Sequence, residues 1–418
     1  MGHLIVIESW VGAMSRLLPR AIREAGHRFT FVTRDLHHYL RSAPAGSTHP
    51  LLTADHVLTL DTNDPARLVE ELAALQPQLG FEGVLSSCDY YLETVALVAE
   101  RLGLPGAPPA AMRAACRKDE TRRTLAHLPG PRFAIARNRA ELLGAARSVG
   151  FPLVVKPVDL CAGMFVRRVD DEAALVAAFD AAAAFPVNAR GQQRAPQLLC
   201  EELLVGPEVS VETVTAGGTT TVVGVTDKAL TGAPWFVEVG HQFPAALDPA
   251  TAAEAADLAR AAVDGLGLDH TVAHTEIKLT ADGPKLVEVN PRPAGNRITE
   301  LVRRVTGVDL ARAHAEVALG ITPDLAPVTT GTASAAVRFL VPEREGELVA
   351  VHGTDGLDAR DGVVEAELPT AGRRTGDGRS NNHYLGHVMT VSSDPDAGAD
   401  AVRLLDEVVL EYAAPVSV

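Results

Sequence analysis

The chain of 418 residues lacks several features that mark whole classes of protein. It has no excess of positive charge: its formal net charge is −15, whereas proteins that bind nucleic acids or anionic membranes carry basic patches. No stretch approaches the roughly 18 apolar residues that a membrane helix needs. The apolar run at its start is short and has no basic leader, unlike a secretion signal. We therefore expect a cytoplasmic protein that binds neither nucleic acid nor membranes.

Cysteines, aromatic residues and one glycine motif are also scarce or missing. The four cysteines lie far apart, and no pair has the spacing of a zinc or redox motif, so we expect free thiols. Aromatic residues account for only 4% of the chain, but apolar residues reach 47%, so aliphatic side chains can build a sizeable core. The Gly-x-Gly-x-x-Gly fingerprint is absent from the first strand–helix unit, which disfavours a dinucleotide-dependent hydride-transfer enzyme.

The first part of the chain alternates strands and helices. Residues 3–7 predict a buried strand, 14–25 a helix and 27–33 a second strand. A short apolar run at 83–87 and a helix over 91–102 follow. This alternation is typical of an α/β fold with a doubly wound parallel sheet. The length of the chain indicates two or three domains in all.

Beyond this unit, the pattern becomes a mixture in which strands dominate. A polar stretch rich in Gly, Asn and Gln, residues 185–196, predicts a mobile surface loop. The expected helices cover residues 141–149, 172–184, 249–265, 298–319 and 397–412. The expected strands cover residues 152–157, 198–203, 208–216, 219–225, 335–341, 363–368 and 386–392, and residues 274–290 predict a β-hairpin.

The hairpin carries several polar side chains at alternate positions. The segment Ala281-Asp282-Gly283 suits a three-residue loop with its glycine in the left-handed conformation. Counting back from this loop places Glu276 opposite Glu288, and His274 opposite Asn290. Because side chains alternate along a strand, all four are expected on one face. The sequence therefore predicts a cluster of oxygen and nitrogen donors on a single surface.

Two carboxylates directly opposite each other destabilise a sheet by up to roughly 1 kcal/mol. A divalent cation would relieve this repulsion, and Mg²⁺ prefers a few protein oxygens together with phosphates. We interpret Glu276, Glu288 and Asn290 as a metal site; a solvated polar face of an ordinary hairpin is the alternative. The same count puts Leu286 on the polar face, and a two-residue Asp282-Gly283 turn would shift the register by one.

Arg292 follows the second strand of the hairpin, just after Pro291 ends the ladder. Its guanidinium is always charged and forked, which suits a transferring phosphoryl group or a developing oxyanion. A surface salt bridge is the alternative role for this arginine. Its position beside the expected metal ligands favours the first interpretation.

Four blocks of sequence, taken in order, resemble the ATP-grasp enzymes, and among these the carboxylate–amine (L-amino acid) ligases. Each block alone is weak, but together they span nearly the whole chain at plausible separations. The blocks are Arg117-Lys118-Asp119-Glu120-Thr121-Arg122, Val154-Val155-Lys156-Pro157 with residues 159–166, residues 200–212, and the end of the hairpin from Glu288 to Gly295.

The resemblance implies an ATP-grasp fold preceded by a Rossmann-like domain and followed by a small α+β segment. We expect the Rossmann-like domain at residues 1–111 and an ATP-grasp lid at 112–196. The ATP-grasp core with the metal site is expected at 197–330, and the C-terminal α+β segment, packing on the core, at 331–418. The lid would close over the site and exclude water.

The resemblance also implies which residues bind ATP and Mg²⁺, with Mn²⁺ as the alternative metal. Lys118 and Lys156 match lysines that contact phosphates, and Glu208 matches the acid that takes the ribose hydroxyls. Gly163 lies in the loop that closes over the phosphates, but neighbours such as Cys161 make this loop unusually apolar and leave its phosphate contacts open. The residues matching the hinge strand at adenine, which acts mainly through backbone groups, are Glu201, Glu202, Leu203 and Leu204. The residues matching the magnesium ligands are Glu276, Glu288 and Asn290.

Further residues match the substrate side of such ligases. Arg292 stands where an acyl phosphate forms. In the segment that begins at Trp235, Glu238 can hold an ammonium group, and His241 can polarise a carboxylate or accept the amine proton. Lys228 lies nearby in the sequence and is a further candidate for the pocket.

The reaction expected from this resemblance has two steps. A substrate carboxylate attacks the γ-phosphate, and an amine then attacks the acyl phosphate, giving an amide or dipeptide, ADP and phosphate. We expect amino acids as the acid and amine substrates, and a homodimer as in many relatives. The alternatives are a carboxylase or formate-using ligase on the same scaffold and a non-catalytic nucleotide-binding regulator.

Overall fold

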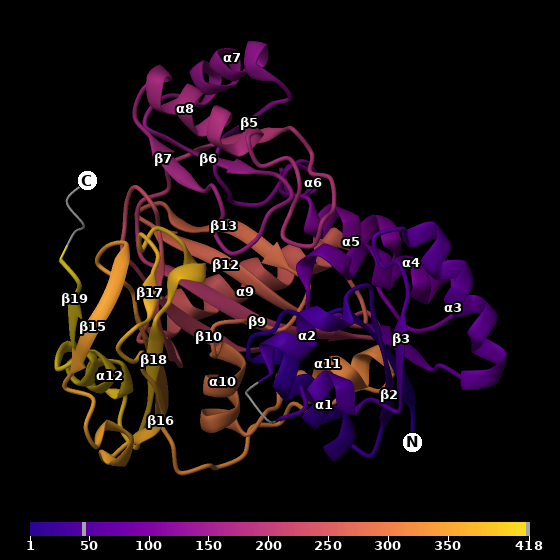
Figure 1. Ribbon diagram of the computed structural model, residues 1–418. Helices are drawn as coiled ribbons and strands as arrows, with labels where there is room; N and C mark the ends of the chain where they lie inside the picture. Colours follow the sequence, from indigo (N-terminus) through magenta and orange to yellow (C-terminus); the bar gives the residue numbers. More distant parts are fainter. Residues whose placement is uncertain (44–46, 415–418) are drawn as a thin grey trace.

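The N-terminal unit is a parallel α/β sheet, as expected. A computed structural model describes residues 1–43 and 47–414 (Figure 1). The sheet has the order β3-β2-β1-β4, and every pair is parallel. The strands are β1 (His3–Ile7), β2 (Arg28–Thr33), β3 (His56–Thr59) and β4 (Gly83–Leu85). The helices are α1 (Met14–Glu24), α2 (Leu36–Ser42), α3 (Pro65–Leu79) and α4 (Leu92–Leu102).

Both faces of this sheet are covered, which explains why every residue of β1 is buried and why four apolar residues follow His3. Leu4 and Val6 pack with α1 and with α11 (Leu310–Ala318), whereas Ile5 and Ile7 pack with α3 and α4. The elements between residues 36 and 79 were not expected from the sequence. The N-terminal unit thus uses one helix from much later in the chain as part of its cover.

The lid is a second, separate sheet that stands above the rest of the molecule in Figure 1. It is antiparallel, with the order β5-β8-β6-β7. The strand β8, expected to begin the core, pairs with β5 and β6, so it belongs to the lid sheet. The lid elements are β5 (Phe133–Ala136), α7 (Arg139–Val149), β6 (Leu153–Pro157), β7 (Arg167–Val169), α8 (Glu172–Ala183) and β8 (Leu198–Glu202).

The central sheet has eight strands in the order β13-β12-β9-β10-β11-β14-β18-β16. The last three come from the C-terminal part of the chain, so this part extends the core sheet as well as packing on it. The strands are β9 (Glu208–Ala216), β10 (Thr219–Leu230), β11 (Glu238–Phe243), β12 (Thr271–Thr280), β13 (Gly283–Asn290), β14 (Ser334–Leu340), β16 (Val363–Glu367) and β18 (Gly386–Ser392). The helices around it are α5 (Pro109–Cys116), α6 (Lys118–Thr124), α9 (Pro249–Leu266), α10 (Ile298–Thr306) and α11.

The two faces of the central sheet have different partners. Val209 and Val211 lie in one apolar cluster with α5 and the alanine-rich α9, while Val214 and Val272 lie in another with α10 and α11. Aliphatic side chains and alanines dominate both clusters, consistent with the low aromatic content. Along β9, the even-numbered positions carry Val214 at one end and the polar side chains of Glu208–Glu212 at the other. The end that α10 and α11 leave uncovered therefore carries the charged residues.

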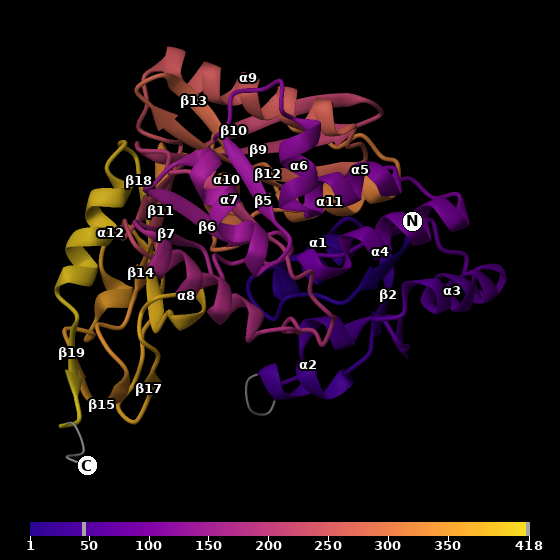
Figure 2. The ribbon, with the colours of Figure 1, turned by 90° about the horizontal axis from the view of Figure 1, so that it is seen from above.

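The C-terminal part departs from the expected elements in two places. The helix expected over 298–319 breaks at Gly307, whose positive φ of 77° ends α10, and Asp309 caps α11. The helix expected over 397–412 ends earlier, and a strand follows it. The elements are α12 (Ala397–Asp406) and a small sheet of order β17-β15-β19, made of β15 (Gly346–His352), β17 (Arg374–Thr375) and β19 (Val409–Tyr412). In Figure 2, α12 lies at the edge of the molecule farthest from the N-terminal unit.

The hairpin has the expected pairing of acidic residues but reaches it differently. Thr280 pairs with Gly283, so the turn has two residues and the predicted three-residue loop is wrong. A β-bulge at Val287 then restores the register, and Glu276 faces Glu288 as predicted. Leu286 was expected on the polar face, and this expectation is wrong. Because of the shorter turn, Leu286 pairs with Ile277 and is buried in the apolar core. His274 pairs with Asn290, also as predicted.

Among residues 1–43 and 47–414, no helix combines the length and apolar character that a bilayer crossing requires.

Candidate active site

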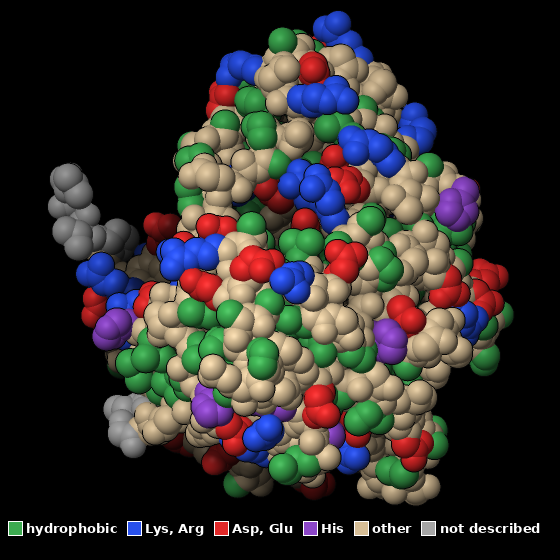
Figure 3. Space-filling view, turned by 90° about the vertical axis from the view of Figure 1, so that its right-hand side faces the viewer, with side chains coloured by type: hydrophobic (Ala, Val, Ile, Leu, Met, Phe, Trp, Pro, Cys, Tyr) green, Lys and Arg blue, Asp and Glu red, His purple; other side chains and the backbone are tan. Residues whose placement is uncertain are grey.

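A cavity of about 750 Å³ is lined by residues of the N-terminal unit, the lid and the central sheet. Figure 3 shows basic and acidic side chains gathered where the lid meets the body of the molecule. Of the residues that sequence reasoning selected or named as candidates for the pocket, His241 and Lys228 are not part of this lining. Those that line the cavity are Lys118, Lys156, Gly163, Glu201, Glu202, Leu203, Leu204, Glu208, Glu238, Glu276, Glu288, Asn290 and Arg292.

On the lid side, a buried carboxylate holds two cations. Glu201 Oε2 lies 2.6 Å from Lys156 Nζ, and its Oε1 lies 2.5 Å from Arg122 Nε. Burial alone would raise the pKa of Glu201, but Arg122 and Lys156 together hold the pKa below its usual value. Burial lowers the pKa of Lys156, and Glu201 opposes this effect. The expected phosphate lysine is thus fixed at the cavity wall by a strand of the lid. Arg122, on α6, was not predicted from the sequence as part of this site.

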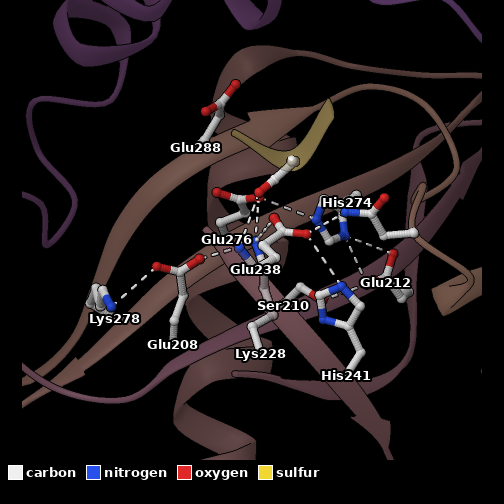
Figure 4. A network of polar contacts seen from close by, with 12 residues as sticks. Glu208, Ser210, Glu212, Lys228, Glu238, His241, His274, Glu276, Lys278 and Glu288 are labelled. Carbon is white, nitrogen blue, oxygen red and sulfur yellow. Dashed lines mark hydrogen bonds and ion pairs between the residues drawn. The ribbon is translucent and has the colours of Figure 1, made fainter. Parts of the chain in front are cut away.

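Lys118 joins the other wall to the hairpin. Its Nζ lies 2.9 Å from Glu288 Oε1 and donates a hydrogen bond to the backbone oxygen of Leu160 at 2.6 Å. Lys118 also occupies the first position of α6, so the start of this helix carries a cation toward the cavity. Figure 4 shows Glu288 apart from the network around Glu276, and its ion pair with Lys118 links it to α6.

A buried lysine stands at the centre of the remaining carboxylates (Figure 4). Lys228 Nζ lies 2.6 Å from Glu276, 3.0 Å from Glu208 and 3.1 Å from Glu238, and its side chain is 1% exposed. The strand pairing explains this arrangement, because Lys228 is directly opposite Glu208 across β9 and β10. Burial opposes the charge of Lys228, but the three carboxylates raise its pKa well above the usual value. Sequence reasoning noted Lys228 only as a neighbour of the pocket.

A buried pair of a carboxylate and a histidine, Glu212 and His274, contacts Glu276. Glu212 is fully buried, and its Oε1 lies 2.9 Å from His274 Nδ1. The other ring nitrogen of His274 lies 3.4 Å from Glu276. Burial lowers the pKa of His274, but Glu212 and Glu276 raise it to about 9. Ser210 donates a further hydrogen bond to Glu212 at 2.8 Å. Glu212 and Ser210 were missed, although their even-numbered spacing from Glu208 on β9 was the signal that could have identified them.

Arg292 is held by an acid from the N-terminal unit. Its Nε and one terminal nitrogen each lie 2.7 Å from Asp89 Oδ1, and both side chains are largely buried. Burial would raise the pKa of Asp89, but Arg292 holds it below its usual value. Trp10 donates from its indole nitrogen to the second oxygen of Asp89 at 2.8 Å. Asp89 was missed; it follows the carboxyl end of β4, where functional residues of parallel sheets gather.

Glu238 lies in the cavity wall with His241 behind it. Asn296 Nδ2 donates to Glu238 Oε2 at 2.5 Å, and His241 Nε2 lies 3.2 Å from the same oxygen. Because His241 is only 3% exposed, it reaches the cavity through Glu238 and not directly. Tyr384, from the C-terminal part, donates to the backbone oxygen of Glu238 at 2.8 Å and stacks on Phe339.

The apolar loop before β7 also lines the cavity. Gly163 has a φ of 67° and the preceding Ala162 has a φ of 56°, so both adopt the left-handed conformation. Cys161 and Met164 line the cavity beside them. The loop therefore contributes backbone groups and small side chains to the cavity edge.

Three family models match the chain in order. They are the ATP-grasp N-terminal domain at residues 20–106, the ATP-grasp domain at 149–300 and the L-amino acid ligase C-terminal domain 2 at 338–413.

Several curated proteins are similar in sequence over much of the chain. An uncharacterized protein of Sinorhizobium fredii is 30% identical over 75% of this chain and 64% of its own length. Carnosine synthase 1 of Homo sapiens is 28% identical over 78% of this chain and 40% of its length. Alanine–anticapsin ligase of Bacillus subtilis (strain 168) is 26% identical over 60% of this chain and 57% of its length. The chain thus spans less than two thirds of the length of these relatives.

Solved structures share the whole architecture. The L-amino acid ligase from Bacillus licheniformis has a TM-score of 0.82 at 23% identity, with 99% of each chain covered. The N5-carboxyaminoimidazole ribonucleotide synthetase from Thermotoga maritima has a TM-score of 0.69 at 17% identity, covering 99% of this chain and 100% of that one. These structures show the fold, and the three ordered family models show that the chain belongs to the ATP-grasp superfamily and carries the C-terminal domain 2 of the L-amino acid ligases.

Proposed function

We propose that this protein is an ATP-dependent, ADP-forming ligase that joins a carboxylate to an amine through an acyl phosphate, with amino acids as substrates. The observation that carries the proposal is one face of oxygen donors, Glu276, Glu288 and Asn290, in the same cavity as Lys118 and Arg292. Membership of the ATP-grasp superfamily and the ligase relatives support it further.

The donor chemistry of the hairpin fits a hard divalent cation. Two carboxylates and one amide on adjacent strands offer only oxygen ligands, and Mg²⁺ is commonly bound by one or two carboxylates together with substrate phosphates. We propose Mg²⁺, with Mn²⁺ as the alternative, held by Glu276, Glu288 and Asn290. Such a cation would offset the negative charge of the nucleotide phosphates.

The nucleotide would lie between the lid and the central sheet. Lys118 from α6 and Lys156 from β6 both line the cavity and would hold the phosphates, together with the loop at Gly163. Backbone groups of residues 201–204 would contact adenine. Glu208, whose carboxylate lies within 3.2 Å of Lys228 and Lys278, would accept hydrogen bonds from the ribose hydroxyls.

The acid and amine substrates would meet at the end of the hairpin. Arg292 would stabilise the acyl phosphate, because its planar fork keeps its charge and is oriented by Asp89. Glu238 would hold the ammonium group of the amine substrate. His241 would act on this site through Glu238, 3.2 Å away, by keeping the carboxylate oriented.

The test is a phosphate-release screen over paired amino acids with purified protein, Mg²⁺ and ATP. We expect ADP and phosphate only when both an acid and an amine substrate are present; AMP and pyrophosphate would contradict the mechanism. Arg292→Ala should lower kcat about 100- to 1,000-fold, and Glu288→Gln should lower activity strongly. Glu407→Gln, the same change at an exposed glutamate paired with Arg360, is the control that should retain activity.

The same assay separates the alternative functions. Turnover that depends on bicarbonate or formate would indicate a carboxylase or a formate-using ligase. Nucleotide binding without turnover, unaffected by Arg292→Ala, would indicate a non-catalytic regulator. We also propose a homodimer, which light scattering after gel filtration will test.

A further inference from the structure

The segment after α8, expected from its composition to be a mobile surface loop, is docked against the N-terminal unit. Asn188 and Arg190 within it are each only 8% exposed. Asn188 Oδ1 accepts hydrogen bonds from the backbone nitrogens of Arg190 and Gln192, at 2.9 and 3.1 Å, which gives the tip of the loop a defined shape. The loop is therefore built to present the Arg190 side chain.

The N-terminal unit has a receiving site for this loop. Asn63 Nδ2 donates to the backbone oxygen of Arg190 at 2.8 Å, and Arg34 donates to the same oxygen. Gln192 Nε2 donates to the backbone oxygen of Tyr90 at 3.1 Å. These contacts join residues that are more than 100 positions apart in the sequence. One residue of each pair lies in the lid loop and the other in the N-terminal unit.

The guanidinium of Arg190 enters an aromatic pocket. Its central carbon lies 5.2 Å from the ring centre of Trp10 and 5.9 Å from that of Tyr39, both within cation–π range. One of its terminal nitrogens donates to the backbone oxygen of Ser9. Glu8, which is buried and accepts from the Tyr39 hydroxyl at 2.5 Å, supplies negative charge to the same pocket. Arg190 thus contacts both the ring of Trp10 and the backbone next to it.

Trp10 also connects Arg190 to Arg292, the proposed catalytic arginine, through Asp89. Its indole nitrogen donates to Asp89 Oδ2 at 2.8 Å, and Asp89 Oδ1 binds Arg292 at 2.7 Å. Tyr90 packs edge-on against Trp10, with ring centres 5.4 Å apart. A continuous series of contacts therefore leads from a loop of the lid to Arg292 at the substrate end of the cavity.

We propose that Arg190 is a positioning residue, which fixes the Trp10 ring so that its indole N–H holds Asp89 against Arg292. This inference rests on the proposed function of Arg292. Its consequence is that the guanidinium of Arg292 has its working orientation only while the lid loop is seated in the N-terminal unit. The docking of the lid loop and the orientation of Arg292 for the acyl-phosphate step are then coupled through four side chains.

The first experiment compares variants along this series. Arg190→Met removes the cation, and Trp10→Phe keeps an aromatic ring, smaller than the indole, but removes the N–H that reaches Asp89. Each should lower kcat about tenfold and leave KM for ATP within about twofold, because the lost contact orients a group that acts in the transition state. The double variant should be no worse than the more severe single variant within about twofold, since both changes break the same series. Arg190→Lys, which keeps the charge but not the planar fork, should recover part of the loss.

The control variant is Gln192→Leu. This change removes another side-chain contact between the same loop and the N-terminal unit but does not touch Trp10. Equal losses of kcat in Gln192→Leu and Arg190→Met would mean that docking of the loop is sufficient, and would overturn the specific role of Arg190.

A second measurement reports the contact without turnover. The chain has two tryptophans, so Trp235→Phe leaves Trp10 as the only fluorophore of this type. In that background Arg190→Met should change the emission of Trp10, whereas Gln192→Leu should leave it nearly unchanged. A wild-type enzyme that turns over, with kcat retained in Arg190→Met and Trp10→Phe, overturns the inference alone. A wild-type protein without any ATP turnover overturns the proposed function and the inference with it.

Discussion

Replacing Glu201 by glutamine tests how the lid holds its cations. The carboxylate contacts Lys156 and Arg122 at 2.6 and 2.5 Å, and all three side chains are at most 6% exposed. Glutamine keeps the shape of the side chain but removes its charge, and its amide nitrogen turns a donor toward one of two groups that can only donate. The neighbouring Glu202 offers a matched control on the same strand, because it pairs with an Arg132 side chain that is 68% exposed.

The expected magnitudes differ widely between these neighbours. Removing one partner of a buried ion pair costs about 3–5 kcal/mol, since it leaves an uncompensated buried charge. An exposed pair is worth about 0–1 kcal/mol. With an m-value of about 2 kcal/mol/M, a difference of about 3 kcal/mol corresponds to a urea midpoint about 1.5 M lower for Glu201→Gln than for Glu202→Gln.

Urea unfolding followed by far-ultraviolet circular dichroism measures this difference. The pH adds a second check, because the pKa of Glu201 is lowered in the folded protein. Its stabilising effect is present above the pKa of the unfolded chain and is lost as the pH falls through the folded value. The gap between wild type and Glu201→Gln should therefore narrow in acid. Equal urea midpoints for the two variants at neutral pH would refute the reasoning.

Two further predictions concern stability. Burial lowers the pKa of His314 to about 4, although its bond to the Ser86 oxygen opposes this, so unfolding allows the ring to take up a proton between about pH 6.5 and 4. The contribution of the neutral His314 ring to the free energy of unfolding should be fully present above pH 6.5 and should fall by about 2 kcal/mol on going to pH 5. The melting temperature of His314→Gln should depend less on pH than that of the wild type, and an unchanged dependence would contradict the assignment. A Cβ on Gly83 would lie 2.2 Å from the backbone oxygen of Ala318, so Gly83→Ala should be destabilising by about 1–3 kcal/mol. Gly144→Ala, in a helix with nothing within 4 Å of the new atom, should instead stabilise by up to about 1 kcal/mol, and a gain in both variants would show that the Gly83 contact is relaxed.

Short-range patterns predicted much of the fold and of the site. The predicted pairing of Glu276 with Glu288 is correct, although a shorter turn and a bulge produce it instead of an unbroken alternation. The first strands and helices fall within a residue or two of their expected bounds. Local sequence patterns failed where two backbone conformations, such as a continued or an ended helix, were both compatible with the pattern. One example is Gly307, whose left-handed conformation ends a helix that the apolar pattern alone would continue.

Partners from distant segments were beyond the reach of sequence patterns. Asp89 and Arg292 are 203 positions apart, and nothing in either segment identifies the other. Lys228 meets three carboxylates because β9 and β11 flank β10 and β12 lies beyond β9, and that order is a property of the whole fold. Likewise, the composition around Arg190 is that of a loop, whereas its burial depends on a pocket contributed by the N-terminal unit.

The bulge at Val287 has a consequence for how this hairpin tolerates change. Turn length and bulge together set the pairing: the residues between Glu276 and Glu288 are four cross-strand pairs, a two-residue turn and the single bulged residue Val287. The bulge is also anchored, because the backbone oxygen of Val287 accepts a hydrogen bond from Arg122, the same arginine that binds Glu201. The turn can therefore lengthen without separating the two acids as long as the bulge stays in place, and the bulge is held by an arginine that belongs to the buried ion cluster of the lid.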